Sequence, residues 1–161
     1  MGIINVTPDS FYDGGKTVSE KEILKQAERM LSEGATFLDV GGYSTRPGAE
    51  DISETEEIRR VVESVESMLK RFPEALISVD TFRSEVAKKA VETGAAIVND
   101  VSGGTLDGEM YKTVAKLNVP YILMHMRGTP KTMAKLTDYK NVTVEVLKNL
   151  SEKIAMARAE G

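Results

Sequence analysis

Five short apolar runs organise this chain, and each has a polar or acidic residue at or near its end. The runs are Met1–Val6, Phe37–Val40, Leu76–Asp80, Ala96–Asp100 and Val119–Met124. A stretch with helical periodicity lies between consecutive runs, so strand and helix alternate. Alternation predicts parallel strands, whose ends all open on one edge of the sheet. Side chains far apart in the sequence then share one wall, and we predict a ligand site there.

The helical stretches carry start and stop signals. Serine followed three residues later by glutamate, the spacing of a capping box, opens the first two, and glycine or proline closes them. These helices are expected between Ser19 and Gly34 and between Ser53 and Pro73. Three further helices are expected at Ser84–Thr93, near Asp107–Leu117 and at about Val142–Glu160.

Two α/β architectures fit this order: an open doubly wound sheet and part of a (β/α)8 TIM barrel. A doubly wound nucleotide-binding domain usually has a glycine fingerprint after its first strand. Here Pro8 stands in that turn, where a phosphate nest needs free amides, and the long segments after the first two strands suit a barrel mouth. A complete barrel takes about 250 residues. We therefore predict a single barrel domain over residues 1–161, with about five of eight units present and truncated on its C-terminal side.

Composition narrows the class of protein. Lys and Arg number 21 against 25 Asp and Glu, a net charge of −4, which provides no electrostatic basis for binding nucleic acid or an anionic membrane. The chain has no cysteine, so disulfides and thiolate metal sites are excluded. No apolar run approaches the roughly 18 residues that span a bilayer, and residues 1–10 do not resemble an export signal. We expect a cytoplasmic protein.

The segments after the first two strands contain candidate chemistry. The stretch TPDSFYDGG combines Asp9 and Asp13 with Phe11, an apolar ring that must return to the core or wait for a ligand. Asp9 alone could equally cap its own turn. The stretch GGYSTRPGA contains Arg46, whose guanidinium suits a carboxylate or phosphate. The alternative for Arg46 is a surface ion pair with nearby Glu50 or Asp51.

Polar residues inside the later strands point to a second group of contacts. Asp80 and Asn99 end neighbouring predicted strands, and a carboxylate beside a carboxamide matches the edge of an aminopyrimidinone ring. Burial of an unpaired carboxylate is costly, which favours a functional Asp80. Asp39 and Asp100 are left open between orienting a loop amide and binding a cation.

The segment after the fifth run contains the single histidine, His125. One histidine cannot form a histidine metal cluster, so a structural role is favoured over that of a general base. Met124 and Met126 are expected to fill apolar space near the pocket. No serine or threonine can be assigned as a nucleophile from spacing.

Five segments together resemble dihydropteroate synthase of the folate pathway. They are GIINVTPDSFYDGG at residues 2–15, DVGGYSTRPGA at 39–49, ISVDT at 77–81, VND at 98–100 and LMHMRGTP at 123–130. The resemblance implies a TIM-barrel transferase. It would condense 6-hydroxymethyl-7,8-dihydropterin diphosphate with 4-aminobenzoate, releasing diphosphate in the presence of Mg²⁺, and would be a target of sulfonamides.

The resemblance also implies roles for residues around the pterin and its diphosphate. Asn5 would coordinate the magnesium that binds the diphosphate. Asp80 and Asn99 would hydrogen-bond the pterin ring, and Thr45 would contact the diphosphate-bearing substrate.

Around the second substrate, Phe11 and Pro47 would enclose the aminobenzoate ring. Asp13 near its amine and Arg46 near the leaving group are the implied catalytic residues. The implied mechanism is dissociative: diphosphate leaves first, and the neutral aniline nitrogen then attacks a resonance-stabilised pterin cation.

Two departures from the family pattern matter. The family often has glutamate where this chain has Tyr43. Later family elements, including a second pterin-binding aspartate, an SRK lysine and a final Arg-x-His, are not in the sequence. We therefore expect this polypeptide alone not to turn over. A homodimer is a further expectation for the full-length protein.

Two alternative functions stay open. A pterin-binding methyltransferase barrel shares the aspartate and asparagine clamp and uses methyltetrahydrofolate, but it has no aniline acceptor. A non-catalytic half-barrel would only bind pterin or pair with another chain.

Overall fold

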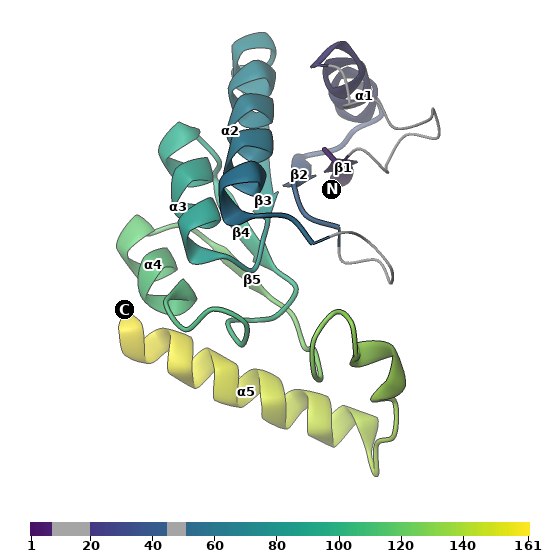
Figure 1. The fold of residues 1–161 in the computed structure, drawn as a ribbon, viewed down its shortest axis with the longest axis vertical. Coiled ribbons are helices and arrows are strands. Elements are labelled where there is room, and N and C mark those ends of the chain that lie inside the picture. Colours follow the sequence, from purple (N-terminus) through teal and green to yellow (C-terminus); the bar gives the residue numbers. More distant parts are fainter. Residues whose placement is uncertain (8–19, 45–50) are drawn as a thin grey trace.

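The computed structural model describes residues 1–7, 20–44 and 51–161. Within these residues five strands alternate with five α-helices, which confirms the predicted α/β order (Figure 1). The elements are β1 Gly2–Asn5, α1 Glu20–Ser32, β2 Phe37–Gly41, α2 Glu54–Arg71, β3 Leu76–Asp80, α3 Ser84–Thr93, β4 Ile97–Asp100, α4 Met110–Leu117, β5 Tyr121–Leu123, the short 3-10 turn η2 Met133–Lys135 and α5 Val142–Glu160.

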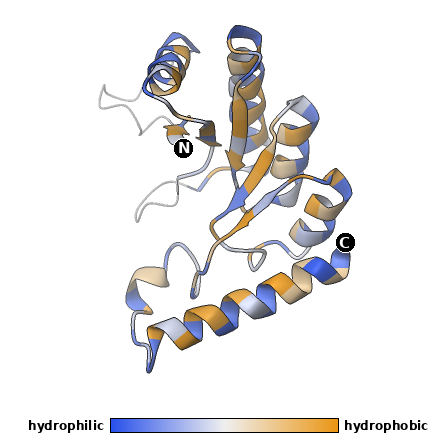
Figure 2. Ribbon diagram, turned by 180° about the vertical axis from the view of Figure 1, so that it is seen from behind, coloured by the Kyte–Doolittle hydropathy of each residue, from blue (hydrophilic) through white to orange (hydrophobic). Residues whose placement is uncertain are grey.

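The strands form one parallel sheet in the order β1-β2-β3-β4-β5, so each strand pairs with the next along the chain. Helices α1 to α4 follow the sheet along one face, and α5 runs beside the β4–β5 end with its C-terminus near α4 (Figure 1). The strands are largely orange in Figure 2, whereas the helices alternate between orange and blue. The colours match helices that have one apolar face against the sheet.

The core lies between the sheet and these helices. Ile4, Val40, Val79 and Val98 pair in register across four strands, and all are fully buried. The helical part of the core consists of Ile23 and Ala27 of α1, Val61, Val65 and Met68 of α2, Val86, Ala87 and Ala90 of α3, and Met110 and Val114 of α4. Side chains alternate along a strand, so the residues next to Ile4, Val40, Val79 and Val98 in their strands face the other side of the sheet.

Local signals set most of the helix ends. Ser53 caps α2 by accepting a hydrogen bond from the Glu56 amide at 3.2 Å, as its position predicts. Gly94 ends α3 in a positive-φ conformation, at 122°. Helix α4 begins at Met110 rather than near Asp107, because the Asp107 carboxylate accepts hydrogen bonds from the Ser84 and Glu109 amides. The predicted cap Ser19 lies outside the described residues. None of the helices that the structure describes is long and apolar enough to cross a membrane.

Candidate functional site

Four strand ends meet in one row across the sheet. Asn5 of β1 pairs with Gly41 of β2, Gly41 with Asp80 of β3, and Asp80 with Asn99 of β4. Partners in a parallel register point to the same face, here the face opposite the helix-covered core. The structure therefore brings together Asn5, Asp80 and Asn99, the three sequence-predicted site residues that lie within the described residues.

Gly41 leaves a gap in the middle of this row. A Cβ atom at Gly41 would lie 3.3 Å from Asp80 Oδ2 and 3.6 Å from Asn5 Oδ1. The two side-chain oxygens thus flank one point that no side chain of β2 fills. A carboxylate and a carboxamide oxygen on either side of such a cradle suit a hard cation or a polar ligand group.

Asp39 lies two residues before Gly41 in β2 and supports the row from the same face of the sheet. Asn99 donates a hydrogen bond from Nδ2 to Asp39 Oδ2 at 3.0 Å, so Asp39 orients the Asn99 side chain. The other carboxylate oxygen of Asp39 and the hydroxyl of Ser78 are buried and have no hydrogen-bond partner among the described residues. Asp39 pairs with Ser78 in the register of β2 and β3. Buried polar atoms without partners mark a place where a ligand could donate hydrogen bonds.

The charge state of Asp80 is shifted toward neutrality. Burial, together with the nearby carboxylates of Asp39, Glu57 and Asp100, raises its pKa to about 7. Among the described residues, none donates a hydrogen bond to the Asp80 carboxylate. A ligand that brings N–H donors or positive charge would stabilise the ionised form. A perturbed carboxyl at a strand exit is typical of a functional site.

The Asp100 side chain lies on the other, helix-covered side of the sheet. Of the two roles considered for it, orienting a loop amide and binding a cation, the structure supports the first. The carboxylate accepts hydrogen bonds from the amides of Ser102 and Gly104, both at 2.7 Å, and from the Tyr121 hydroxyl at 2.6 Å. The buried Lys153 ammonium donates to the carbonyl oxygens of Ser102 and Met124. Asp100 therefore fixes the segment that follows β4.

His125 is held by two side chains, which agrees with a structural role. Its Nδ1 lies 2.7 Å from Asn149 Oδ1 and its Nε2 lies 3.0 Å from the Tyr139 hydroxyl. Met126 is buried, as expected for a core-filling methionine, but Met124 is 41 % exposed. The apolar packing role predicted for both methionines therefore fits Met126 better.

The remaining predicted contacts lie outside the described residues. They are Asp9, Phe11, Asp13, Thr45, Arg46 and Pro47. Their proposed roles depend on the sequence resemblance alone.

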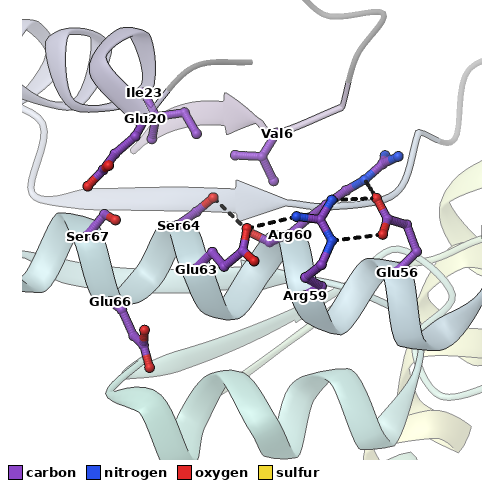
Figure 3. Close-up of a pocket in the computed structure, with 10 residues that line it drawn as sticks. All are labelled: Val6, Glu20, Ile23, Glu56, Arg59, Arg60, Glu63, Ser64, Glu66 and Ser67. Carbon is purple, nitrogen blue, oxygen red and sulfur yellow. Dashed lines mark hydrogen bonds and ion pairs between the residues drawn. The ribbon is translucent and has the colours of Figure 1, made fainter. Parts of the chain in front are cut away.

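A pocket of about 340 Å³ lies between α1 and α2, on the helix side of the sheet (Figure 3). Several of its charged groups form ion pairs along α2. Glu56 pairs with Arg59 at 2.8 Å and with Arg60 at 2.7 Å, and Arg59 also pairs with Glu63 at 2.9 Å. Because these groups satisfy each other and lie away from the strand-end row, the pocket is not the candidate site.

Asn5 and Asp80 fit part of a magnesium site. Mg²⁺ usually binds one or two protein oxygens and completes its shell with water and substrate phosphates. The two oxygens that flank the Gly41 cradle match that donor set. No group of three or more His, Cys, Asp or Glu side chains suited to a metal is found within residues 1–7, 20–44 and 51–161.

Sequence reasoning missed two features of this region. The Gly41 gap depends on strand register, which no local pattern reveals. The second is Glu57, a fully buried glutamate whose carboxylate accepts from Thr81 Oγ1 at 2.7 Å and pairs with Arg83 at 2.7 Å. Its position one helical turn before the buried Val61 was the available signal, because a charge within an apolar stripe requires a partner.

The comparisons with known proteins point to one family. The family model described as pterin binding enzyme matches residues 1–161. Dihydropteroate synthase of Escherichia coli K12 is 45% identical over 161 residues, covering 100% of this chain and 56% of the relative. The chain therefore spans about half the length of such bacterial relatives. It spans 22% of a folic acid synthesis protein of Pneumocystis carinii, to which it is 48% identical.

Solved structures agree on the fold. A Yersinia pestis dihydropteroate synthase, described as a complex with a sulfonamide drug, is 41% identical with a TM-score of 0.90, covering 99% of this chain and 57% of that one. A Xanthomonas albilineans dihydropteroate synthase with 4-aminobenzoic acid is 41% identical with a TM-score of 0.87, covering 99% and 56%. The five parallel strands thus correspond to about half of these TIM barrels, as the sequence predicts.

Proposed function

Because this chain belongs to the pterin-binding enzyme family, we propose that it carries the pterin half of a dihydropteroate synthase active site. The full-length gene product would condense 6-hydroxymethyl-7,8-dihydropterin diphosphate with 4-aminobenzoate, giving 7,8-dihydropteroate and diphosphate. One observation carries the proposal: Asn5, Gly41, Asp80 and Asn99 form a single row of strand ends on one face of the sheet.

Asp80 and Asn99 are proposed to bind the aminopyrimidinone edge of the pterin. That edge presents adjacent N–H donors, which an unpaired carboxylate can accept, and a ring carbonyl, which an amide N–H can meet. Asp39 orients the Asn99 amide, and its second oxygen remains as an acceptor. Because the Asp80 pKa is near 7, bound N–H donors would draw the carboxyl into its charged form.

The diphosphate is proposed to lie beside Asn5. Asn5 Oδ1, beside the Gly41 cradle, would bind Mg²⁺ together with phosphate oxygens. When bound, Mg²⁺ supplies charge neutralisation for the departing diphosphate. Thr45, in the connection after β2, is proposed to contact the same substrate.

The 4-aminobenzoate is proposed to lie against Phe11 and Pro47, with Asp13 near its amine and Arg46 near the leaving group. Support comes from the motifs NVTPDSF and STRPGA. It also comes from the Xanthomonas albilineans relative, which is described with 4-aminobenzoic acid. Sulfonamides are proposed to compete with this substrate, since the Yersinia pestis relative is described as a sulfonamide complex.

The proposed reaction breaks the bond between the pterin methylene carbon and the diphosphate oxygen, and the electron pair leaves with diphosphate. The aniline nitrogen then forms a bond to that carbon and loses one proton. Residues of this chain would stabilise the cationic pterin through the Asp80 carboxylate and hold its ring through Asn99. A cytoplasmic location and a homodimer are part of the proposal for the full-length gene product.

The test is a pair of titrations on the full-length gene product. A pterin should bind alone, and 4-aminobenzoate should bind when diphosphate and Mg²⁺ are present. Asn99→Ala should weaken pterin binding roughly tenfold or more, since it removes a hydrogen-bonding partner. Asn141→Ala is the matched control: it removes the α5 cap, at a cost of about 1 kcal/mol in unfolding free energy, and should leave pterin affinity unchanged.

Two results would contradict the proposal. Pterin binding without any 4-aminobenzoate binding would favour the methyltransferase or half-barrel alternatives. Dihydropteroate formation by residues 1–161 alone, at the rate of the full-length gene product, would show that this chain is not merely part of the active site.

A further inference from the structure

One arginine contacts both ends of the connection between β2 and α2. Arg83 Nη2 donates to the carbonyl oxygen of Ile52 at 3.0 Å and lies 3.7 Å from Asp51 Oδ1. The same guanidinium lies over the Tyr43 ring, 5.2 Å from its centroid. Tyr43 comes soon after β2, and Asp51 and Ile52 come just before α2. A single planar side chain therefore spans the start and the finish of this connection.

The two ends also lie near each other. Burial, together with the nearby Asp51 carboxylate, raises the pKa of Tyr43. The Tyr43 ring packs edge-on against Phe82, with centroids 5.1 Å apart, and Phe82 in turn lies 5.3 Å from the guanidinium of Arg83. Cation–π contacts of this kind favour arginine over lysine, because the guanidinium is planar and weakly hydrated.

A buried carboxylate forms an ion pair with Arg83. Glu57 of α2 is fully buried, and its Oε2 lies 2.7 Å from Arg83 Nη1. Its other oxygen accepts the hydrogen bond from Thr81, the residue directly after Asp80. A buried carboxylate is tolerated only when it is paired and hydrogen-bonded, so the position of Arg83 is tightly determined. The exit of β3 and the base of the β2–α2 connection thus share one network.

We propose that Tyr43, Asp51 and Arg83, with Glu57 as buried counterion, form a clasp that positions the β2–α2 connection for substrate binding. The inference rests on the proposed function, because Thr45 and the other predicted substrate contacts of that connection lie between the two ends of the clasp. Fixing both ends lowers the conformational entropy that binding would otherwise have to remove. These are positioning residues, and none of them is assigned a contact with substrate.

The clasp gives Tyr43 a positioning role. In this chain the Tyr43 ring lies against the Arg83 guanidinium, with the Asp51 carboxylate of the far end near enough to raise the pKa of the hydroxyl. Replacing the ring should therefore disturb the connection without touching the strand-end row.

The test uses the full-length gene product and four variants. Arg83→Lys keeps a positive charge near Glu57. It loses the planar guanidinium with its several N–H donors and the contacts of that plane with the Tyr43 and Phe82 rings. Tyr43→Leu removes the ring, and Tyr43→Phe removes only the hydroxyl. Arg59→Lys is the matched control, because Arg59 makes exposed ion pairs along α2 and contacts neither end of the connection.

Ligand binding separates positioning from general damage. Arg83→Lys and Tyr43→Leu should raise the Kd for 4-aminobenzoate, measured with diphosphate and Mg²⁺, roughly tenfold. The Kd for a pterin should stay within about twofold, since the row around Asp80 is intact. The Kd of Tyr43→Phe for 4-aminobenzoate should lie between those of wild type and Tyr43→Leu. The Kd of Arg59→Lys should match that of wild type. Unchanged 4-aminobenzoate binding, or equal weakening for both ligands, would overturn the clasp.

Hydrogen exchange tests the clasp without any substrate. Amides of residues 42–44 and 51–53 should exchange roughly tenfold faster in Tyr43→Leu, with the amides of β1 and β4 unchanged. Unchanged exchange at both ends would overturn the clasp whatever the ligands do. A wild-type protein that binds no 4-aminobenzoate would instead overturn the proposed function, and the exchange result would still decide whether the clasp exists.

Discussion

Asp80 and Asp100 end neighbouring strands of the same sheet, yet their surroundings differ in kind. Asp100 faces the helices, where two backbone amides and the Tyr121 hydroxyl donate to it. Asp80 faces the opposite side, where no described residue donates to its carboxylate, and burial together with three other carboxylates raises its pKa to about 7. The first arrangement stabilises the fold, and the second leaves a carboxylate without a donor among the described residues.

The difference follows from the pleat of the strands. Asp100 pairs in register with Leu123, one step beyond the Asn99 row, so it points to the helix side while Asn99 points to the other. A shift of one residue in the sheet exchanges structural and ligand-facing positions. The two aspartates therefore make a matched pair for experiments.

The largest effect is expected for Asp100→Ala. The variant leaves two amides, the Tyr121 hydroxyl and the nearby Lys153 ammonium without their carboxylate, in a fully buried site. We expect a loss of about 3–5 kcal/mol in unfolding free energy, measured by urea denaturation. Asp100→Asn, which keeps one acceptor oxygen, should lose less. Equal stability of wild type and Asp100→Ala would show that the Asp100 carboxylate does not stabilise the fold.

Asp80→Asn should instead reduce pterin binding with little loss of stability. The substitution keeps the volume but removes the negative charge that the pterin N–H groups are proposed to meet, and we expect roughly a 100-fold weaker Kd. Titration calorimetry measures the affinity and thermal unfolding measures the stability. Wild-type affinity in this variant would show that the Asp80 carboxylate is not the pterin acceptor.

The pKa of Asp80 predicts opposite pH trends for stability and affinity. Its folded pKa of about 7 lies above the ordinary value of 3.8, so the folded state binds the proton more tightly than the unfolded state. This contribution to stability is complete below about pH 4 and is lost as the pH rises through about 7. Pterin affinity should rise over the same interval. The difference in Tm between wild type and Asp80→Asn, measured from pH 4 to 8, isolates the effect, and a flat difference would contradict it.

The smallest structural change with a specific outcome is Gly41→Ala. Gly41 does not have a positive φ, and an added methyl would lie 3.3 Å from Asp80 Oδ2, so we expect a stability change under about 1 kcal/mol. The methyl would occupy the cradle beside Asn5 and weaken diphosphate binding with Mg²⁺ roughly tenfold. Calorimetry with and without EDTA measures this. An unchanged, EDTA-sensitive affinity would place the metal elsewhere.

Much of the fold could be predicted from local pattern. Four of the five apolar runs contain an observed strand, and the run Phe37–Val40 covers all of β2 except its last residue, Gly41. Ser53 and Gly94 bound α2 and α3 as their types predict. Asp107 shows the limit of this approach, because its side chain accepts from the Ser84 amide at the start of α3 as well as from the Glu109 amide just before α4. An aspartate can start the helix that follows it in the sequence, or it can bind a segment that is distant in the sequence. Only the structure distinguishes the two roles.

The sequence by itself determined the alternation of strand and helix, the parallel sheet and the presence of acid and amide residues at the strand ends. Periodicity and caps act over a few residues, so they can be read along the chain. Tertiary structure decided which of these residues share a face: Asn5 with Asp80 and Asn99 on one side, Asp100 on the other. It also decided the pKa of Asp80 and the clasp around Arg83. Both depend on register and on distances between distant segments, and no local pattern encodes them.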